Sequence, residues 1–235
     1  MRFIVNKNIK WRILWLFLFI LCGPVEAAFT VSGTRFIYEE GKKNISFDVT
    51  NNLTKTYGGQ VWVDNISQSD GVYMVPTPPF FRVKPKQKQI VRIMKTDSGM
   101  LPTDRESLFW LNIQEIPPKP EAEGSVLAIA INTKVKIFYR PKALIAERKG
   151  AEKKIKLTQR GNTLYLKNPT PYYFAVTKVK VGGKTAVLNP DDEQKLSIFE
   201  PFSEQPVHGL PVNSTGISID TINDWGGVEN HALSR

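Results

Sequence analysis

Residues 126–140, VLAIAINTKVKIFYR, form the stretch that most constrains the fold. Their odd-numbered positions are apolar or β-branched at a strict period of two: Leu127, Ile129, Ile131, Thr133, Val135 and Ile137. The even-numbered positions are mixed, and Pro141 follows. This alternation predicts one long β-strand, ended by a proline that cannot donate to a ladder. At about 3.3 Å per residue the strand would extend roughly 45 Å, where ordinary strands hold about 5–6 residues.

Short alternating segments separated by turn residues precede this strand. We predict strands at residues 29–38, 45–49, 60–63, 75–81, 89–94 and 107–113. Two tryptophans, Trp62 and Trp110, lie within these segments and are expected in the core. About seven strands without a long helical period are the number found in an immunoglobulin-like sandwich.

A second series of strands follows a polar, unpatterned stretch at residues 148–153. We predict strands at residues 162–166, 172–181, 195–199 and 217–222. The acidic run Asp191-Asp192-Glu193 follows Asn189-Pro190, which indicates a solvated turn rather than a calcium site. The predicted fold class is therefore all-β, with two β-sandwich domains at residues 28–142 and 143–235.

The first 27 residues have the pattern of a secretory signal peptide. Four Lys or Arg residues precede an apolar run at residues 13–22, and small residues lead to a predicted cleavage after Ala27. The apolar run is half of the roughly 20 residues that a membrane-spanning helix needs. Cleavage would remove four basic residues and one acidic residue, lowering the net charge from +10 to +7, and would remove the only cysteine, Cys22. We expect an exported chain that does not span the membrane and that folds without disulfides.

The composition argues against several classes of function. Two histidines, His208 and His231, and no cysteine in the mature chain leave no metal-ligand spacing, and no nucleophile elbow or glycine-rich phosphate loop is present. The lysines alternate with apolar residues, as on the solvated face of strands, so nucleic-acid binding is not indicated. We expect neither an enzyme nor a cofactor.

Seven motifs, in order along nearly the whole mature chain, resemble those of the periplasmic pilus-assembly chaperones, the immunoglobulin-like family exemplified by PapD. The motifs are Thr34-Arg35, Thr77-Pro78-Pro79 with Arg82, Asp104-Arg105-Glu106-Ser107-Leu108-Phe109-Trp110, Glu115-Ile116-Pro117-Pro118, Lys136-Ile137-Phe138-Tyr139-Arg140-Pro141, Asn168-Pro169-Thr170-Pro171-Tyr172-Tyr173 and Ile222-Asn223-Asp224-Trp225-Gly226-Gly227. The resemblance implies two immunoglobulin-like domains at an angle, with a subunit-binding cleft between them.

The resemblance also implies how a subunit is held. The family lends an edge strand to a subunit that lacks one, which is a form of β-strand addition. Here the donated row would be Leu127, Ile129 and Ile131. From periodicity alone these residues would more often face the chain's own core, and it is the resemblance that favours donation.

Two further sets of residues are implied by the resemblance. Arg35 and Lys136 match the cations that anchor the subunit's C-terminal carboxylate, although without the resemblance they would be ordinary surface cations. Lys136 has the opposite parity from the donor row, so twist or a bulge must reconcile the two. Glu106, Arg140 and Asp224 match an interdomain charge network that would set the angle between the domains.

The predicted function is that of a periplasmic chaperone in a chaperone/usher pathway. Its partners would be fimbrial or pilin subunits and an outer-membrane usher, and the ten-residue loop at 116–125 resembles that of the short-loop subclass. The alternatives are a secreted β-sandwich adhesin or structural subunit, and a carbohydrate-binding sandwich that would need an exposed aromatic platform. The free chain is also expected to hide its apolar edge, for which self-association is a hypothesis.

Overall fold

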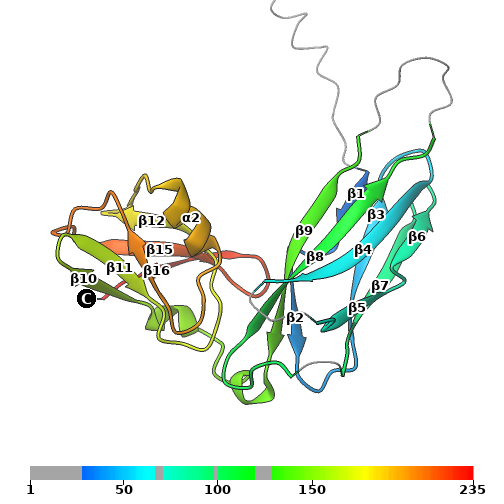
Figure 1. Ribbon diagram of the computed structural model, residues 1–235. Helices are drawn as coiled ribbons and strands as arrows, with labels where there is room; N and C mark the ends of the chain where they lie inside the picture. The colour runs from blue at the N-terminus through cyan, green and yellow to red at the C-terminus, as the bar shows by residue number, and fades with distance from the viewer. Residues whose placement is uncertain (1–27, 67–70, 98–99, 120–128, 235) are drawn as a thin grey trace, which may run out of the picture.

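The computed structural model describes residues 28–66, 71–97, 100–119 and 129–234. Two β-sandwiches follow one another along the chain and meet at an angle, with the β15–β16 turn of the second reaching the first (Figure 1). The all-β, two-domain prediction is confirmed. The helices of the described chain are short, and none is long and apolar enough to cross a membrane. The signal-peptide prediction concerns residues outside the described chain.

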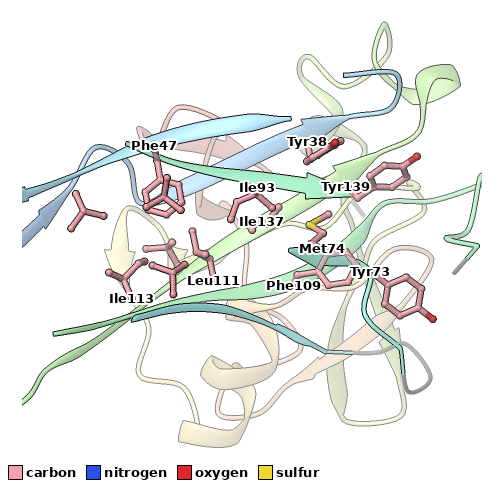
Figure 2. Packing of buried hydrophobic residues seen from close by; sticks show 14 of the residues in the cluster. Tyr38, Phe47, Tyr73, Met74, Ile93, Phe109, Leu111, Ile113, Ile137 and Tyr139 are labelled. Carbon is pink, nitrogen blue, oxygen red and sulfur yellow. The ribbon is translucent and has the colours of Figure 1, made fainter. Parts of the chain in front are cut away.

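The N-terminal sandwich packs a five-stranded sheet on a four-stranded sheet. The first contains, in order, β2 (Arg35–Glu39), β9 (Asn132–Arg140), β8 (Ser107–Ile116), β4 (Tyr57–Asn65) and β6 (Phe80–Val83). The second contains β1 (Phe29–Val31), β3 (Ile45–Asn51), β7 (Lys88–Lys95) and β5 (Met74–Thr77). Side chains from the two sheets meet in one core, where Ile93 of β7 lies beside Ile137 of β9 (Figure 2).

The C-terminal sandwich has smaller sheets and the one α-helix of the described chain. Its strands are β10 (Lys156–Arg160), β11 (Thr163–Lys167) and β14 (Glu204–Val207) in one sheet, and β13 (Lys184–Thr185), β12 (Val176–Val181), β15 (Ile217–Ile222) and β16 (Val228–Ala232) in the other. The helix is α2 (Pro190–Ser197), and the 3-10 turns η1 (Lys142–Leu144) and η2 (Ala151–Lys154) lie between the sandwiches in sequence.

Strand β9 has the predicted alternation of faces but a shorter described length. Val135, Ile137 and Tyr139 enter the core, whereas Lys136 and Phe138 lie on the opposite face. The strand begins at Asn132 rather than near residue 126, and residues 126–128 lie outside the described chain. The pairing with β8 reaches one residue further back, since the Glu115 amide donates to the Ile131 carbonyl at 2.9 Å.

Two predicted N-terminal strands are each split in the structure. Residues 29–38 become β1 and β2, which belong to different sheets, because the chain crosses the sandwich edge at residues 32–34. Residues 75–81 become β5 and β6, interrupted at Pro78-Pro79, which have no amide hydrogens for a ladder. Periodicity identified the extended backbone but not the change of partner strand.

The core position predicted for the two tryptophans is wrong. Trp62 and Trp110 are only partly buried and lie outside the core clusters. The core residues of β8 are Phe109, Leu111 and Ile113, so Trp110 faces away from them. The Trp110 ring instead lies under the ammonium groups of Lys134 and Lys136, each 5.6 Å from its centroid.

The predicted solvated turn at Asp191-Asp192-Glu193 is also wrong, because these residues form the first turn of α2. The Asn189 side chain caps the helix by accepting from the Asp191 amide at 3.0 Å, and Pro190 occupies the first helical position. Asp192 is buried and accepts from the backbone amide of His208 at 2.7 Å. The helix extends to Ser197 and therefore also replaces most of the strand predicted at residues 195–199.

Other elements of the C-terminal sandwich differ from the prediction by extent or were not predicted. The strand expected at residues 172–181 begins only at Val176, where the pairing with β15 starts. Three strands, β13, β14 and β16, lack the apolar alternation on which the prediction depended. Strands β13 and β16 are mostly exposed, and β14 contains a proline.

Candidate functional site

The two cations matched by the resemblance stand side by side where the domains meet. Strands β2 and β9 run parallel, and Arg35 is the register partner of Lys136. Both are partly buried. Adjacent positions on neighbouring strands place side chains on one face of the sheet, here the face opposite the core. Like charges placed directly opposite each other destabilise a sheet, so the arrangement requires another explanation.

Neither cation forms an ion pair with a carboxylate of the described chain. The Arg35 guanidinium donates through Nη1 to the Ile222 carbonyl at 2.8 Å and lies 5.7 Å from the Phe138 ring, while its buried Nε has no partner. Lys136 donates through Nζ to the Ser197 carbonyl. Both cations therefore contact backbone oxygens of the second domain and keep unneutralised charge.

The protonation of both groups reflects this environment. Burial lowers the pKa of Arg35, although the charge of Asp224 acts in the opposite direction. Burial, together with repulsion from Arg35, lowers the pKa of Lys136 from 10.5 to about 8. A bound anion would oppose both pKa decreases, since it would favour the charged form of each side chain.

A pocket of about 290 Å³ opens beside Lys136. Lys136 is its one lining residue from the N-terminal sandwich; the others are Ala175, Leu188, Ile222 and residues of β12 and α2. The helix C-terminus, the Ser197 carbonyl and the lysine ammonium thus meet at one wall of the pocket.

The segment that leads into β9 has apolar side chains that remain exposed in the described chain. Ile129 and Ile131 are 68% and 44% exposed, and Leu127 lies outside the described residues. Strand β2 pairs with β9 only from Lys136 onward, and β8 occupies the other edge. In the described chain, the edge of β9 at residues 132–135 therefore has no partner strand. Exposed apolar residues next to an open edge are a template for strand addition.

The structure brings Glu106, Arg140 and Asp224 together between the domains. Arg140 donates from Nε to Glu106 at 2.6 Å and from Nη1 to Asp224 at 2.8 Å. Glu106 also accepts from the Tyr173 amide at 2.9 Å, and this carboxylate thus bridges both sandwiches. Burial raises the pKa of Glu106 although Arg140 opposes the shift.

A fourth member of this network, Arg148, was missed from the sequence. It donates to Glu152 at 2.7 Å and approaches Asp224 to 3.2 Å, with only 9% of its side chain exposed. The sequence around it, residues 148–153, is polar and unpatterned. The available signal was the spacing of four between Arg148 and Glu152, which the turn at Gly150 (φ +74°) and η2 bring together.

An apolar contact accompanies the charged network. Leu108 and Phe138, on the face of the sheet opposite the core, pack with Tyr173 of the second domain. The rings of Phe138 and Tyr173 are 6.4 Å apart. Charged and apolar contacts together join the two sandwiches at the base of the site.

The groups gathered here can bind an anion and a strand. Within the described residues no three His, Cys, Asp or Glu side chains are grouped as metal ligands. What the site offers is two unneutralised cations, an open strand edge and a neighbouring pocket.

Comparison with known proteins agrees with this geometry. The family described as "Pili and flagellar-assembly chaperone, PapD N-terminal domain" matches residues 28–145, and "Pili assembly chaperone PapD, C-terminal domain" matches residues 150–233. The chain belongs to the PapD family of pilus-assembly chaperones.

Relatives of this PapD-family chaperone are similar over almost their whole length. Chaperone protein FanE of Escherichia coli is 44% identical over 218 residues, covering 92% of this chain and 94% of FanE. The crystal structure of the periplasmic chaperone SfaE matches with a TM-score of 0.72 at 32% identity, covering 88% of this chain and 100% of that one.

One solved neighbour of the family is a complex. The Salmonella enterica SafA pilin bound to the SafB chaperone contains a chain that matches with a TM-score of 0.75 at 28% identity, covering 91% of this chain and 99% of that one. The family predicted from the motifs is therefore confirmed.

Proposed function

We propose that this chaperone binds fimbrial subunits by donor-strand complementation and delivers them to an outer-membrane usher. The observation that carries the proposal is the pair Arg35 and Lys136, two unneutralised cations standing beside an unpaired edge of β9. The complex of SafA pilin with SafB supports a pilin as the class of partner.

The subunit's last strand would add along β9 at residues 132–135. Such a strand, running parallel to β9, would be collinear with β2, which occupies the same edge from Lys136 onward. Its C-terminal carboxylate would then reach the beginning of β2, where Arg35 and Lys136 would bind it. Charge-assisted hydrogen bonds of this kind are roughly twice as strong as neutral ones.

The donated row would consist of Leu127, Ile129 and Ile131. The parity problem posed by Lys136 has a simple solution in this arrangement. Ile129 and Ile131 have the parity of Val135 and Ile137, which enter the chaperone's own core. Beyond the end of that sandwich core, the same face would enter the core of the subunit, while Lys136 remains on the other face toward the cleft.

The charge network would hold the cleft in one shape. Arg140 links Glu106 to Asp224, and Arg148 links Asp224 to Glu152, so five buried or mostly buried groups connect the domains. A network of this kind specifies geometry more than it adds stability. We further propose that residues 1–27 are a signal peptide cut after Ala27, that the chaperone acts in the periplasm, and that the domains divide between residues 142 and 143.

Periplasmic co-purification tests the proposal. Tagged chaperone is co-expressed with a fimbrial subunit encoded by a neighbouring gene, as wild type and as Arg35→Ala/Lys136→Ala. The control is Arg92→Ala/Lys156→Ala, which removes the same charge from exposed strand positions in the two domains. We expect capture by wild type and control, and loss in the folded cleft variant. Equal capture by all three chains would refute the anchor.

A further inference from the structure

Apolar and charged side chains together line the pocket beside Lys136. Val176, Val179, Leu188, Leu196 and Ile222 form its apolar part, and Lys136, Lys178 and Glu193 are its charged lining residues. The apolar part offers a surface on which an apolar group of an occupant can be buried away from water. A volume of about 290 Å³ suits one large apolar side chain.

A bulge in β12 shapes the pocket. Val176 pairs with Thr221 and Lys178 pairs with Asp220, which leaves Thr177 as an extra residue between them. Thr177 lines the pocket and is exposed, and its hydroxyl donates to the Asp220 carbonyl at 3.2 Å. Bulges occur often beside binding sites, where they redirect a side chain.

The opposite wall is held by the ends of α2. The Asn189 cap and the bond from the His208 amide to Asp192 fix the beginning of the helix, and the Lys136 ammonium binds the Ser197 carbonyl at its end. The pocket therefore exists before any ligand arrives and shares Lys136 with the anion site.

We propose that this pocket is a specificity subsite that receives an apolar side chain from one of the last two residues of the bound subunit. The inference rests on the proposed function, because it places the chain's terminal carboxylate at Arg35 and Lys136. Neighbouring residues of a strand point to opposite faces. Only one of the two terminal side chains can therefore point toward the face on which Lys136 meets α2.

The experiment uses the full mature chaperone and defined peptides. Fluorescein-labelled peptides of about ten residues, the length of a long strand, alternate Val and Ser and end in a free carboxylate or in an amide. Their last and next-to-last positions are each varied between Ala and Phe. Fluorescence anisotropy gives the affinities for wild type, for Thr177→Phe, which fills the pocket, and for Thr185→Phe, which adds the same ring on exposed β13 outside it.

The expected result has two parts. Wild type and Thr185→Phe bind carboxylate peptides more tightly than amides and prefer Phe to Ala at one of the two positions by about tenfold, the order expected for burying a large apolar side chain. Thr177→Phe keeps the preference for the carboxylate but loses the preference for Phe.

The contradicting results separate the two hypotheses. Absence of carboxylate dependence in wild type would overturn the proposed function together with this inference. Carboxylate dependence without any side-chain preference would overturn the subsite alone. An equal loss of preference in Thr177→Phe and Thr185→Phe would also overturn it, since only one of these substitutions lies in the pocket.

Discussion

Arg35 and Lys136 are register partners on the parallel strands β2 and β9, and no carboxylate of the described chain pairs with either. The free protein thus keeps two like charges together and partly removed from water. An arrangement that is unfavourable in the free protein, but that an anion would stabilise, is typical of a binding site rather than of a structural contact.

The affinity for a subunit should fall above pH 8. The pKa of Lys136 is about 8 in the free chaperone because of burial and the adjacent Arg35. A bound carboxylate favours the ammonium form and raises this pKa, so a proton is taken up on binding once the pH exceeds 8. The affinity should be level below pH 8 and fall by up to about tenfold per pH unit above it.

Titration calorimetry from pH 6 to 10 measures the change in this affinity. The Lys136→Arg chain keeps its charge and should show no such fall; an identical fall would exclude Lys136 as its cause.

Removing the lysine should stabilise the free chaperone while abolishing its binding. Lys136→Met removes a desolvated cation beside Arg35, and we expect a gain of about 1 kcal/mol in the free energy of unfolding at pH 7. The folded pKa lies below the unfolded one, so wild-type stability rises between pH 8 and 10.5 and the difference should shrink there. Urea unfolding measures it. Lys134→Met, at an exposed position of the same strand, should change stability by less than about 0.5 kcal/mol. A loss of stability in Lys136→Met would contradict the account.

The interdomain Arg140 should contribute far more to the free energy of unfolding than the exposed Arg105. Arg140→Met leaves Glu106 buried without its cation, and we expect a loss of about 3–5 kcal/mol in the free energy of unfolding. Arg105→Ala breaks an exposed pair with Asp104 and should cost about 0–1 kcal/mol. Thermal unfolding compares the two chains. Similar losses of stability in the two variants would show that the buried network contributes no more than an exposed ion pair.

Arg148 should fix the angle between the domains. Arg148→Ala removes the bonds to Glu152 and Asp224, and we expect a loss of about 1–3 kcal/mol and a wider range of interdomain angles. Small-angle scattering should show a larger maximum dimension than for wild type. Lys149→Ala, at the exposed next residue, serves as the control. Scattering curves that coincide for all three chains would leave Arg148 with a local role only.

The sequence was most informative where one face of a strand is buried. In β9 the period of two correctly separated Val135 and Ile137, which enter the core, from Lys136, which does not. The family was evident from motifs spread over the chain. The adjacency of Arg35 and Lys136 followed only from the resemblance, because 100 residues separate them and no local pattern predicts a parallel pairing between them.

Features decided by tertiary contacts were missed. The cap at Asn189 and the proline after it could have indicated a helix, but the eight-residue α2 has almost no apolar periodicity. The burial of Asp192 in this helix depends on a hydrogen bond from the backbone amide of His208, which is distant in sequence. The spacing of four between Arg148 and Glu152 indicates an ion pair but not its burial, which depends on η2 and the β15–β16 turn.

The most direct test of the carboxylate anchor is the capture of a subunit whose C-terminus has been moved. A fimbrial subunit encoded by a neighbouring gene is co-expressed with the wild-type chaperone, with its natural end or extended by a short Gly-Ser tail. If the carboxylate binds Arg35 and Lys136 while the last strand lies along β9, the tail prevents one of these contacts, and capture should fall by about tenfold or more. Equal capture of both subunits would contradict the account, because the chain end would then not be what these two cations bind.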